Sequence, residues 1–312
     1  MSKMYEALTR GQHAVPGLDL RQLMGEEDAV ISTPAAPSLP EPEAQVTAVN
    51  EIQHEIASLP PSLSLDLNLV RTLPLRLAPS APLLPFDGSD PRAGEQYRIL
   101  RTKVLQSSAR NRMIVVTSSG PNDGKTVTVI NLAGALALRS DARVLILDAD
   151  FRRSTIMDKL GFPPASGLAE VLEGHCQVHD AIVHVQQIPN LYVLPSGTPK
   201  VNPSELIDSP TWTTLCRRLR ATFTHIIVDS PPVAAVADYD LIQASCDGVI
   251  LVARPDHTNR AQCLKMLGLV PKDKLIGMVM NCAAGWLLRK DQRYEYYNYS
   301  AHTESPQMAE TR

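Results

Sequence analysis

Short apolar runs alternate with amphipathic segments along most of the chain from residue 91 onward. The apolar runs predict strands at 112–117, 143–148, 225–229, 247–253 and 275–281. The segments between them predict helices at 93–108, 124–138, 211–221, 239–245 and 258–269, with short helical pieces near 167–173 and 203–208. Because residues 248–252 are apolar throughout, we expect helices on both faces of a parallel sheet. The pattern therefore predicts an α/β fold with a mostly parallel, doubly wound sheet.

The first 90 residues follow a different pattern, rich in proline, serine, alanine and glutamate. This composition is typical of a linker or a disordered segment, and we expect a largely disordered region at 1–90. Met4, Tyr5 and Leu8 have helical spacing, which indicates either a docking helix or a weakly structured tail. The leucines between residues 63 and 69 alternate with polar residues, which indicates either a strand at a sheet edge or, again, a weakly structured segment. Residues 91–284 would form the folded domain and 285–312 a mobile tail.

The composition excludes several classes of protein. A formal net charge of −3 argues against nucleic-acid binding, which usually needs a basic face. No apolar run approaches the roughly 20 residues that cross a bilayer, and the first residues lack the apolar core of a signal peptide. The five cysteines are scattered and form no C-x-x-C pair. We therefore expect a cytoplasmic protein without structural disulfides or zinc.

A phosphate-binding loop is indicated at residues 117–126, which read Thr-Ser-Ser-Gly-Pro-Asn-Asp-Gly-Lys-Thr between a predicted strand and a predicted helix. Such a loop directs backbone N–H groups and the positive end of the helix dipole toward phosphate oxygens. Lys125 would reach the β- and γ-phosphates and Thr126 would bind Mg²⁺. The P-loop pattern fails at Ser119, where it usually has its first glycine. The residues expected to contact the nucleotide are Ser119, Gly120, Pro121, Asn122, Asp123, Gly124, Lys125, Thr126 and Val127.

Two further apolar strands end in aspartate, at Asp148-Ala-Asp150 and at Asp229. The carboxyl ends of parallel strands meet at one edge of the sheet, so we expect these aspartates beside the phosphate loop. Asp229 fits the Walker B position that holds Mg²⁺. The alternative for any one of them is a cap on the following turn. Asn281 also ends a predicted strand, where it would contact adenine or simply make a turn.

Taken together and in this order, the motifs resemble the bacterial tyrosine kinases of exopolysaccharide and capsule synthesis, over about residues 91–300. Residues 118–126 resemble the proline-containing Walker A of that family, 148–152 its Walker A′ motif and 229–232 its Walker B. The stretches 167–174 and 195–205 also match it. Deviant-Walker ATPases that partition DNA or position division sites are the nearest alternative, but they carry a signature lysine where this chain has Gly120. A scaffold that binds nucleotide without chemistry is a third possibility, which the intact motifs disfavour.

The resemblance implies an activity and a set of roles. The chain would use ATP and Mg²⁺ to phosphorylate tyrosines, with Lys125, Asp148, Asp150 and Asp229 as catalytic residues. Thr126, Asp148 and Asp229 would hold the metal. Asp150 is the better candidate for the base that accepts the tyrosine proton, although the choice between Asp148 and Asp150 stays open. Regulation of exopolysaccharide or capsule polymerisation and export would be the purpose.

Two other features fit this resemblance. Glu95, Arg98 and Arg101 lie within an arc of about 120° on a helix and resemble the E-x-x-R-x-x-R oligomerisation motif; a solvated helix face is the alternative. Near the end of the chain lies a cluster of tyrosines that resembles the autophosphorylated tail of the family. The alternative is a strand or an aromatic patch that stacks on RNA. The clustered residues are Tyr294, Tyr296, Tyr297 and Tyr299.

The expected partners follow from the same resemblance. They are other copies of the chain, in a ring, together with a separate membrane polysaccharide co-polymerase that activates the kinase and a cognate tyrosine phosphatase. The protein would lie at the inner face of the cell membrane through its partner. Phosphorylation would occur in trans, with the tail of one subunit in the site of its neighbour.

Overall fold

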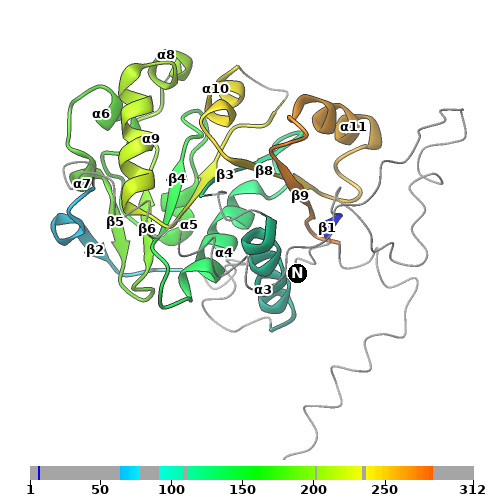
Figure 1. Ribbon diagram of the computed structural model, residues 1–312, viewed down its shortest axis with the longest axis horizontal. Helices are drawn as coiled ribbons and strands as arrows, with labels where there is room; N and C mark the ends of the chain where they lie inside the picture. The colour runs from blue at the N-terminus through cyan, green and yellow to red at the C-terminus, as the bar shows by residue number, and fades with distance from the viewer. Residues whose placement is uncertain are drawn as a thin grey trace, which may run out of the picture.

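The computed structural model describes residues 6–7, 64–77, 91–107, 112–200, 202–233 and 237–283. The described strands form one sheet in the order β1-β9-β8-β3-β7-β4-β6-β5-β2 (Figure 1). The strands are β1 (Glu6–Ala7), β2 (Arg71–Leu73), β3 (Met113–Ser118), β4 (Val144–Asp148), β5 (Val183–Val185), β6 (Leu191–Leu194), β7 (His225–Asp229), β8 (Gly248–Ala253) and β9 (Leu275–Met280).

The sheet is mostly parallel, as predicted, with two antiparallel pairings. These are β1 with β9 and β5 with β6. The helices between the strands are α3 (Pro91–Ser107), α4 (Lys125–Ala137), α5 (Ile156–Leu160), α6 (Leu168–Leu172), α7 (Val178–Ala181), α8 (Pro203–Ile207), α9 (Pro210–Thr222), α10 (Asp238–Ala244) and α11 (Arg260–Leu269). In the part of the chain described here, no helix has both the length and the apolarity that a membrane span requires.

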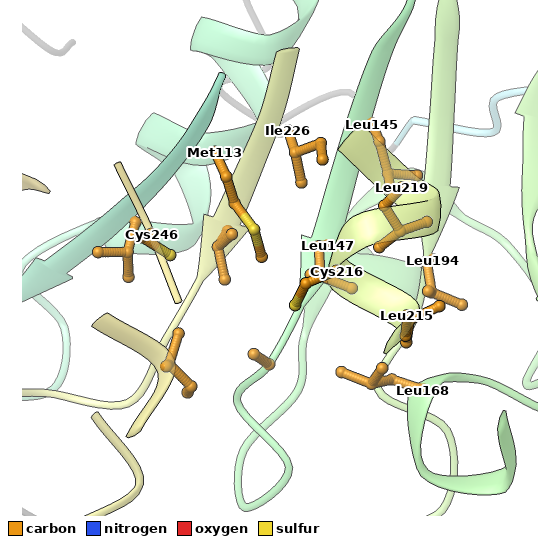
Figure 2. Close-up of a cluster of buried hydrophobic side chains, with 14 of the residues drawn as sticks. Met113, Leu145, Leu147, Leu168, Leu194, Leu215, Cys216, Leu219, Ile226 and Cys246 are labelled. Carbon is orange, nitrogen blue, oxygen red and sulfur yellow. The ribbon is translucent and has the colours of Figure 1, made fainter. Parts of the chain in front are cut away.

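Helices cover both faces of the sheet, so the doubly wound prediction is confirmed. Successive side chains of a strand point to opposite faces, and β3 shows the result. Met113 and Val115 belong to a core under α9 and α10, whereas Ile114 and Val116 belong to a second core under α3 and α4. Figure 2 shows part of the first core, in which side chains of α9 lie over those of β4 and β7.

Two patterns in the first 90 residues take another form where the structure describes them. Glu6–Ala7 forms a strand, so the docking helix, one of the two interpretations of this segment, does not extend through these residues. The leucines at 67 and 69 lie in a 3₁₀ helix, Leu67–Leu69, because the Asp66 carboxylate accepts hydrogen bonds from the backbone and side-chain nitrogens of Asn68. Such local bonds favour a turn over a strand.

A strand does form at the sheet edge, but a few residues later. β2 pairs in parallel with β5, and Leu65 and Val70 are buried against the core under α9. Residues 64–77 are therefore part of the folded unit and not a linker. The other parts of the division into 1–90, 91–284 and 285–312 stay predictions, because residues 8–63, 78–90 and 284–312 lie outside the described residues.

Candidate active site

The phosphate loop connects β3 to α4, and its shape depends on two residues with positive φ. Asn122 has φ 65° and Gly124 has φ 95°, a region that glycine adopts without cost. A Cβ on Gly124 would lie only 1.9 Å from Asn281 Nδ2. The same Asn281 nitrogen donates a hydrogen bond of 3.0 Å to the Asp123 carbonyl. Asn281 thus holds the loop itself, and its contact with adenine stays a prediction.

The Asp123 side chain braces the loop from within. Its carboxylate accepts hydrogen bonds from Gly120 N at 3.3 Å and from Thr258 Oγ1 at 2.8 Å. His257 Nε2 lies 3.7 Å from the same carboxylate and 3.1 Å from the Pro121 carbonyl oxygen. Asp123 therefore contributes its backbone to the phosphate loop, while its carboxylate binds the segment between β8 and α11.

The first residues of α4 meet the Walker B strand. Thr126 Oγ1 donates a 2.7 Å hydrogen bond to Asp229 Oδ2. The other carboxylate oxygen of Asp229 is buried and has no hydrogen-bond partner among the residues that the structure describes. Lys125 is also largely buried, at 9% exposed. The charge of Lys125 and the Thr126 hydrogen bond lower the pKa of Asp229, but its burial outweighs both and raises that pKa to about 6.

The sheet places Asp148 directly beside Asp229, since the two residues are in register on β4 and β7. Both oxygens of Asp148 are engaged, one by Asp150 N at 3.2 Å and the other by Ser154 Oγ at 2.5 Å. Burial, and then the charge of Asp229, raise the pKa of Asp148 well above its ordinary value. Two carboxyl groups in such proximity favour one shared negative charge over two.

Asp150 begins the turn that follows β4. Its Oδ1 accepts a 3.0 Å hydrogen bond from Arg153 N, and its side chain is 8% exposed. Asp150 is thus less deeply buried than Asp148, which is 0% exposed. Of the two candidates for the base, Asp150 has the better access from solvent.

The site fits a magnesium ion that is bound mainly by hydroxyl, phosphate and water oxygens. In the described ranges, no cluster of three or more His, Cys, Asp or Glu side chains is arranged to hold a metal by itself. Mg²⁺ commonly uses only one or two carboxylates and keeps several waters. The unpartnered oxygen of Asp229, next to the Thr126 hydroxyl, has the chemistry for such a site.

The stretches 167–174 and 195–205 come together through one carboxylate. Glu170 accepts hydrogen bonds from Gly167 N at 2.8 Å and from Thr198 N at 3.0 Å. A Cβ on Gly167 would lie 2.3 Å from Gly197 N, so the two segments need glycine at this position. Their role is to fix the backbone near the Walker A′ turn, where Lys200 N lies 3.4 Å from the Phe151 carbonyl oxygen.

The three residues predicted to take part in oligomerisation lie on α3, away from this site (Figure 1). Arg98 Nη1 lies 2.6 Å from Glu95 Oε2, and both side chains are about half exposed. Arg101 donates a 3.1 Å hydrogen bond to the Ala135 carbonyl of α4. Arg101 is thus committed within its own subunit, while the exposed pair has room for a partner. The four tail tyrosines lie outside the described residues.

The site contains four further residues that the sequence did not indicate. His257 and Thr258 hold the phosphate loop, Ser154 binds Asp148, and Asp238 accepts a 2.9 Å hydrogen bond from Arg152 Nε. Ser154 lies two residues after the Walker A′ motif, so a polar residue at this position could have indicated a contact with the motif's aspartates. The contacts of Thr258 and Asp238 join residues 135 and 86 positions apart, which no local pattern indicates.

The loop, the three aspartates and the doubly wound sheet define a P-loop nucleotide-binding domain. Residues 111–267 match the family model described as "AAA domain". The chain is 34% identical over 207 residues to the tyrosine-protein kinase YwqD of Bacillus subtilis, covering 65% of this chain and 85% of that protein. It is 35% identical over 203 residues to the tyrosine-protein kinase ptk of Acinetobacter johnsonii, but spans only 27% of that longer protein.

The chain is also similar to solved structures, among them the kinase domain of a bacterial tyrosine kinase. The chimerical protein CapA2B2 has a TM-score of 0.60 and 27% identity, covering 73% of this chain and 96% of that chain. The kinase domain of the Escherichia coli tyrosine kinase ETK has a TM-score of 0.57 and 27% identity, covering 67% and 87% respectively. The chain belongs to the bacterial tyrosine kinase family.

Proposed function

We propose that this chain is an ATP-dependent protein-tyrosine autokinase that phosphorylates its own C-terminal tyrosine cluster in trans. The observation that supports it most is the meeting of Thr126, Asp229 and Asp148 at one edge of the sheet, beside the phosphate loop. Gly120 stands where partition-type ATPases carry their signature lysine, which favours the kinase over that alternative. The related proteins that are named as tyrosine kinases favour it as well.

The chain's own residues have distinct roles in the proposed transfer. The backbone of the phosphate loop binds the phosphates and Lys125 neutralises charge on the γ-phosphate. Thr126 and Asp229, with Asp148 beside them, would hold Mg²⁺, which supplies further charge neutralisation at the β- and γ-phosphates. Protein groups mainly position the reactants and stabilise charge in such reactions.

Asp150 accepts the proton of the acceptor tyrosine. A free phenol has a pKa of about 10, so a nearby carboxylate is needed for a reactive oxygen at neutral pH. The phenolic oxygen forms a bond to the γ-phosphorus, the bond from that phosphorus to the β–γ bridging oxygen breaks, and ADP leaves. Asp150 is the better placed of the two acids because both oxygens of Asp148 already accept hydrogen bonds.

The biological setting is also a proposal. The kinase would regulate exopolysaccharide or capsule polymerisation and export at the inner face of the membrane, through a separate membrane co-polymerase, and a cognate phosphatase would reverse its modification. Subunits would assemble into a ring through Glu95 and Arg98, with Arg101 behind them. Charge repulsion between phosphorylated tails would then loosen the ring.

The direct test is incubation of the full chain with Mg-ATP, followed by mapping of phosphotyrosine by mass spectrometry. We expect phosphate on the tail, and loss of most of it after substitution of Tyr294, Tyr296, Tyr297 and Tyr299 by phenylalanine. Nucleotide affinity should be unchanged, because phenylalanine deletes only the acceptor hydroxyl. Equal phosphotyrosine in the substituted chain would place the acceptors elsewhere. Tyr192, which is half-buried on β6, would then be the first to test.

The oligomer has its own test. Arg98→Ala with Arg101→Ala should lower the mass of the unphosphorylated protein in light scattering, and lower autophosphorylation in dilute solution. Gln106→Ala, at an exposed position near the end of the same helix, is the matched control and should change neither. An unchanged mass for the double variant would remove this surface from the proposal.

A further inference from the structure

Arg152, in the turn after β4, is held in an unusual way for a surface arginine. Its side chain is 42% exposed, and its Nε donates a 2.9 Å hydrogen bond to Asp238 Oδ2. The partner carboxylate is buried, with 2% of its side chain exposed, at the first residue of α10. The other oxygen of Asp238 accepts a 2.5 Å hydrogen bond from Ser204 Oγ of α8. One buried carboxylate thus joins the Walker A′ turn to two helices.

This arrangement leaves most of the guanidinium available. Only Nε binds Asp238, and the terminal nitrogens of Arg152 make no hydrogen bond to another residue in the described part of the chain. A guanidinium offers five N–H donors in a planar fork that matches a carboxylate or a phosphate. Asp238 and Ser204 fix the plane of that fork before a ligand arrives, which reduces the entropy lost on binding.

The position of Arg152 relative to the proposed base determines what the fork can reach. Arg152 is two positions after Asp150 in the sequence, so their Cα atoms lie at most about 7 Å apart. An extended peptide rises by about 3.3 Å per residue. When one tyrosine of such a peptide is at Asp150, a neighbour one or two residues away is within reach of Arg152.

We propose that Arg152 is the subsite for an anionic group that flanks the acceptor tyrosine. This inference rests on the proposed function of the chain as a kinase of its tail. The tail offers two such groups: the carboxylate of Glu295, between Tyr294 and Tyr296, and the phosphate of a tyrosine already modified. The first phosphate on the tail therefore makes the tail a better substrate. One guanidinium binds only one phosphate. A tail that carries several phosphates therefore still leaves the active site, because its remaining negative charges repel one another.

The test uses the full chain with its four tail tyrosines replaced by phenylalanine, so that it accepts peptides without modifying itself. Three peptides of residues 290–302 serve as substrates: unmodified, with phosphotyrosine at 297, and with Glu295→Gln. We expect KM to be about fivefold to tenfold lower for the phosphopeptide than for the unmodified peptide, because charge-assisted bidentate bonds are the strong ones. For the Glu295→Gln peptide, KM should rise about twofold.

Arg152→Lys separates a binding role from a structural one. Lysine keeps a positive charge that can pair with Asp238, but its single ammonium group cannot bind a second anion through two parallel hydrogen bonds, as a guanidinium can. The KM ratio between unmodified peptide and phosphopeptide should then fall to about one. Arg153→Lys, at the exposed neighbouring side chain, is the control and should keep the full ratio. Ser204→Ala, which frees one oxygen of Asp238, should lower the ratio in part.

The outcomes distinguish the two levels of the proposal. Transfer to no peptide at all, with ATP still bound, contradicts the autokinase proposal and the subsite with it. Transfer to all three peptides with equal KM overturns the subsite alone. A preference for the phosphopeptide that survives Arg152→Lys in a folded protein, checked by thermal melting, also overturns it.

Discussion

The two ends of the central strands differ in how their aspartates are paired, one of them partly exposed and the other buried. At the amino end, Asp247 lies just before β8 and both of its oxygens are paired, one with Arg220 Nη2 at 2.9 Å and the other with Met113 N at 2.8 Å. At the carboxyl end, Asp229 accepts one hydrogen bond from Thr126, and its second oxygen has no partner within the described part of the chain. Both are aspartates beside the same sheet, so the residue type does not decide their role.

This difference separates stability from function. A carboxylate that is removed from water is costly unless it is paired and hydrogen-bonded. At the amino end the pairing compensates the cost within the folded chain. At the carboxyl end the cost persists, as the raised pKa of Asp229 shows. We infer that the compensation at the carboxyl end comes from bound ligands.

The largest expected effect comes from Asp229→Asn. We expect tail phosphorylation to fall by about a thousandfold or more, because in the proposed mechanism the variant loses the charge that would hold the metal. The folded protein without nucleotide should be more stable, by on the order of 1–2 kcal/mol, since a desolvated charge is removed while the Thr126 hydrogen bond has an acceptor left. Phosphotyrosine blots and urea denaturation measure the two effects.

Asp208→Asn, at an exposed position after α8, is the control for this variant and should leave both quantities unchanged. A less stable Asp229→Asn protein would contradict the comparison between the two ends, because it would mean that the Asp229 carboxylate already stabilises the fold without ligands.

Asp247→Asn should lower the stability of the protein and leave its kinase activity unchanged, the reverse of Asp229→Asn. It removes the charge that pairs with Arg220 and weakens the bonds from Arg112 N and Met113 N. We expect a loss of about 2 kcal/mol in the free energy of unfolding. This loss is smaller than that from breaking a fully buried ion pair, because about a quarter of each side chain is exposed. Phosphorylation per folded molecule should stay the same.

Asp141→Asn is the matched surface control for this loss. Its pair with Arg139 has side chains that are 53% and 42% exposed, and exposed pairs of this kind contribute about 0–1 kcal/mol. Equal losses from the two variants would mean that the pairing at the amino end has no special role.

Much of this fold was predictable from the sequence because its strands are apolar throughout. β3, β4, β7, β8 and β9 were each predicted to within a residue or two. β5 and β6 were missed: they have three and four residues, too few for a periodic pattern to distinguish them from a loop. β2 was displaced, since an Asp66 turn interrupted the leucine alternation.

The candidate site was predictable where its residues are neighbours in sequence. The phosphate loop and the two aspartate motifs are local, and the parallel sheet brings them together at its carboxyl edge. The supports of those motifs are not local. Asp123 binds Thr258 and Arg152 binds Asp238 across 135 and 86 positions, so only the three-dimensional structure identifies them.

His225, the first residue of β7, provides the smallest and most specific test of the comparison. Burial, and then the charge of Arg139, lower its pKa to about 4 from an ordinary value of 6.5. The unfolded chain therefore binds a proton at this histidine more readily than the folded chain. The stability that the neutral side chain contributes is fully present above pH 6.5 and is lost as the pH falls from 6.5 toward 4.

The measurement compares the protein with His225→Gln, which is neutral at every pH. Between pH 7.5 and pH 5.0 the free energy of unfolding should fall more for the unsubstituted protein than for the variant, by about 1–2 kcal/mol. Other groups titrate in this range, but they titrate in both proteins, so the difference between the two curves isolates His225. Parallel curves would show that the amino end of the sheet tolerates a new charge. In that case the contrast with the carboxyl end would rest on Asp247 alone.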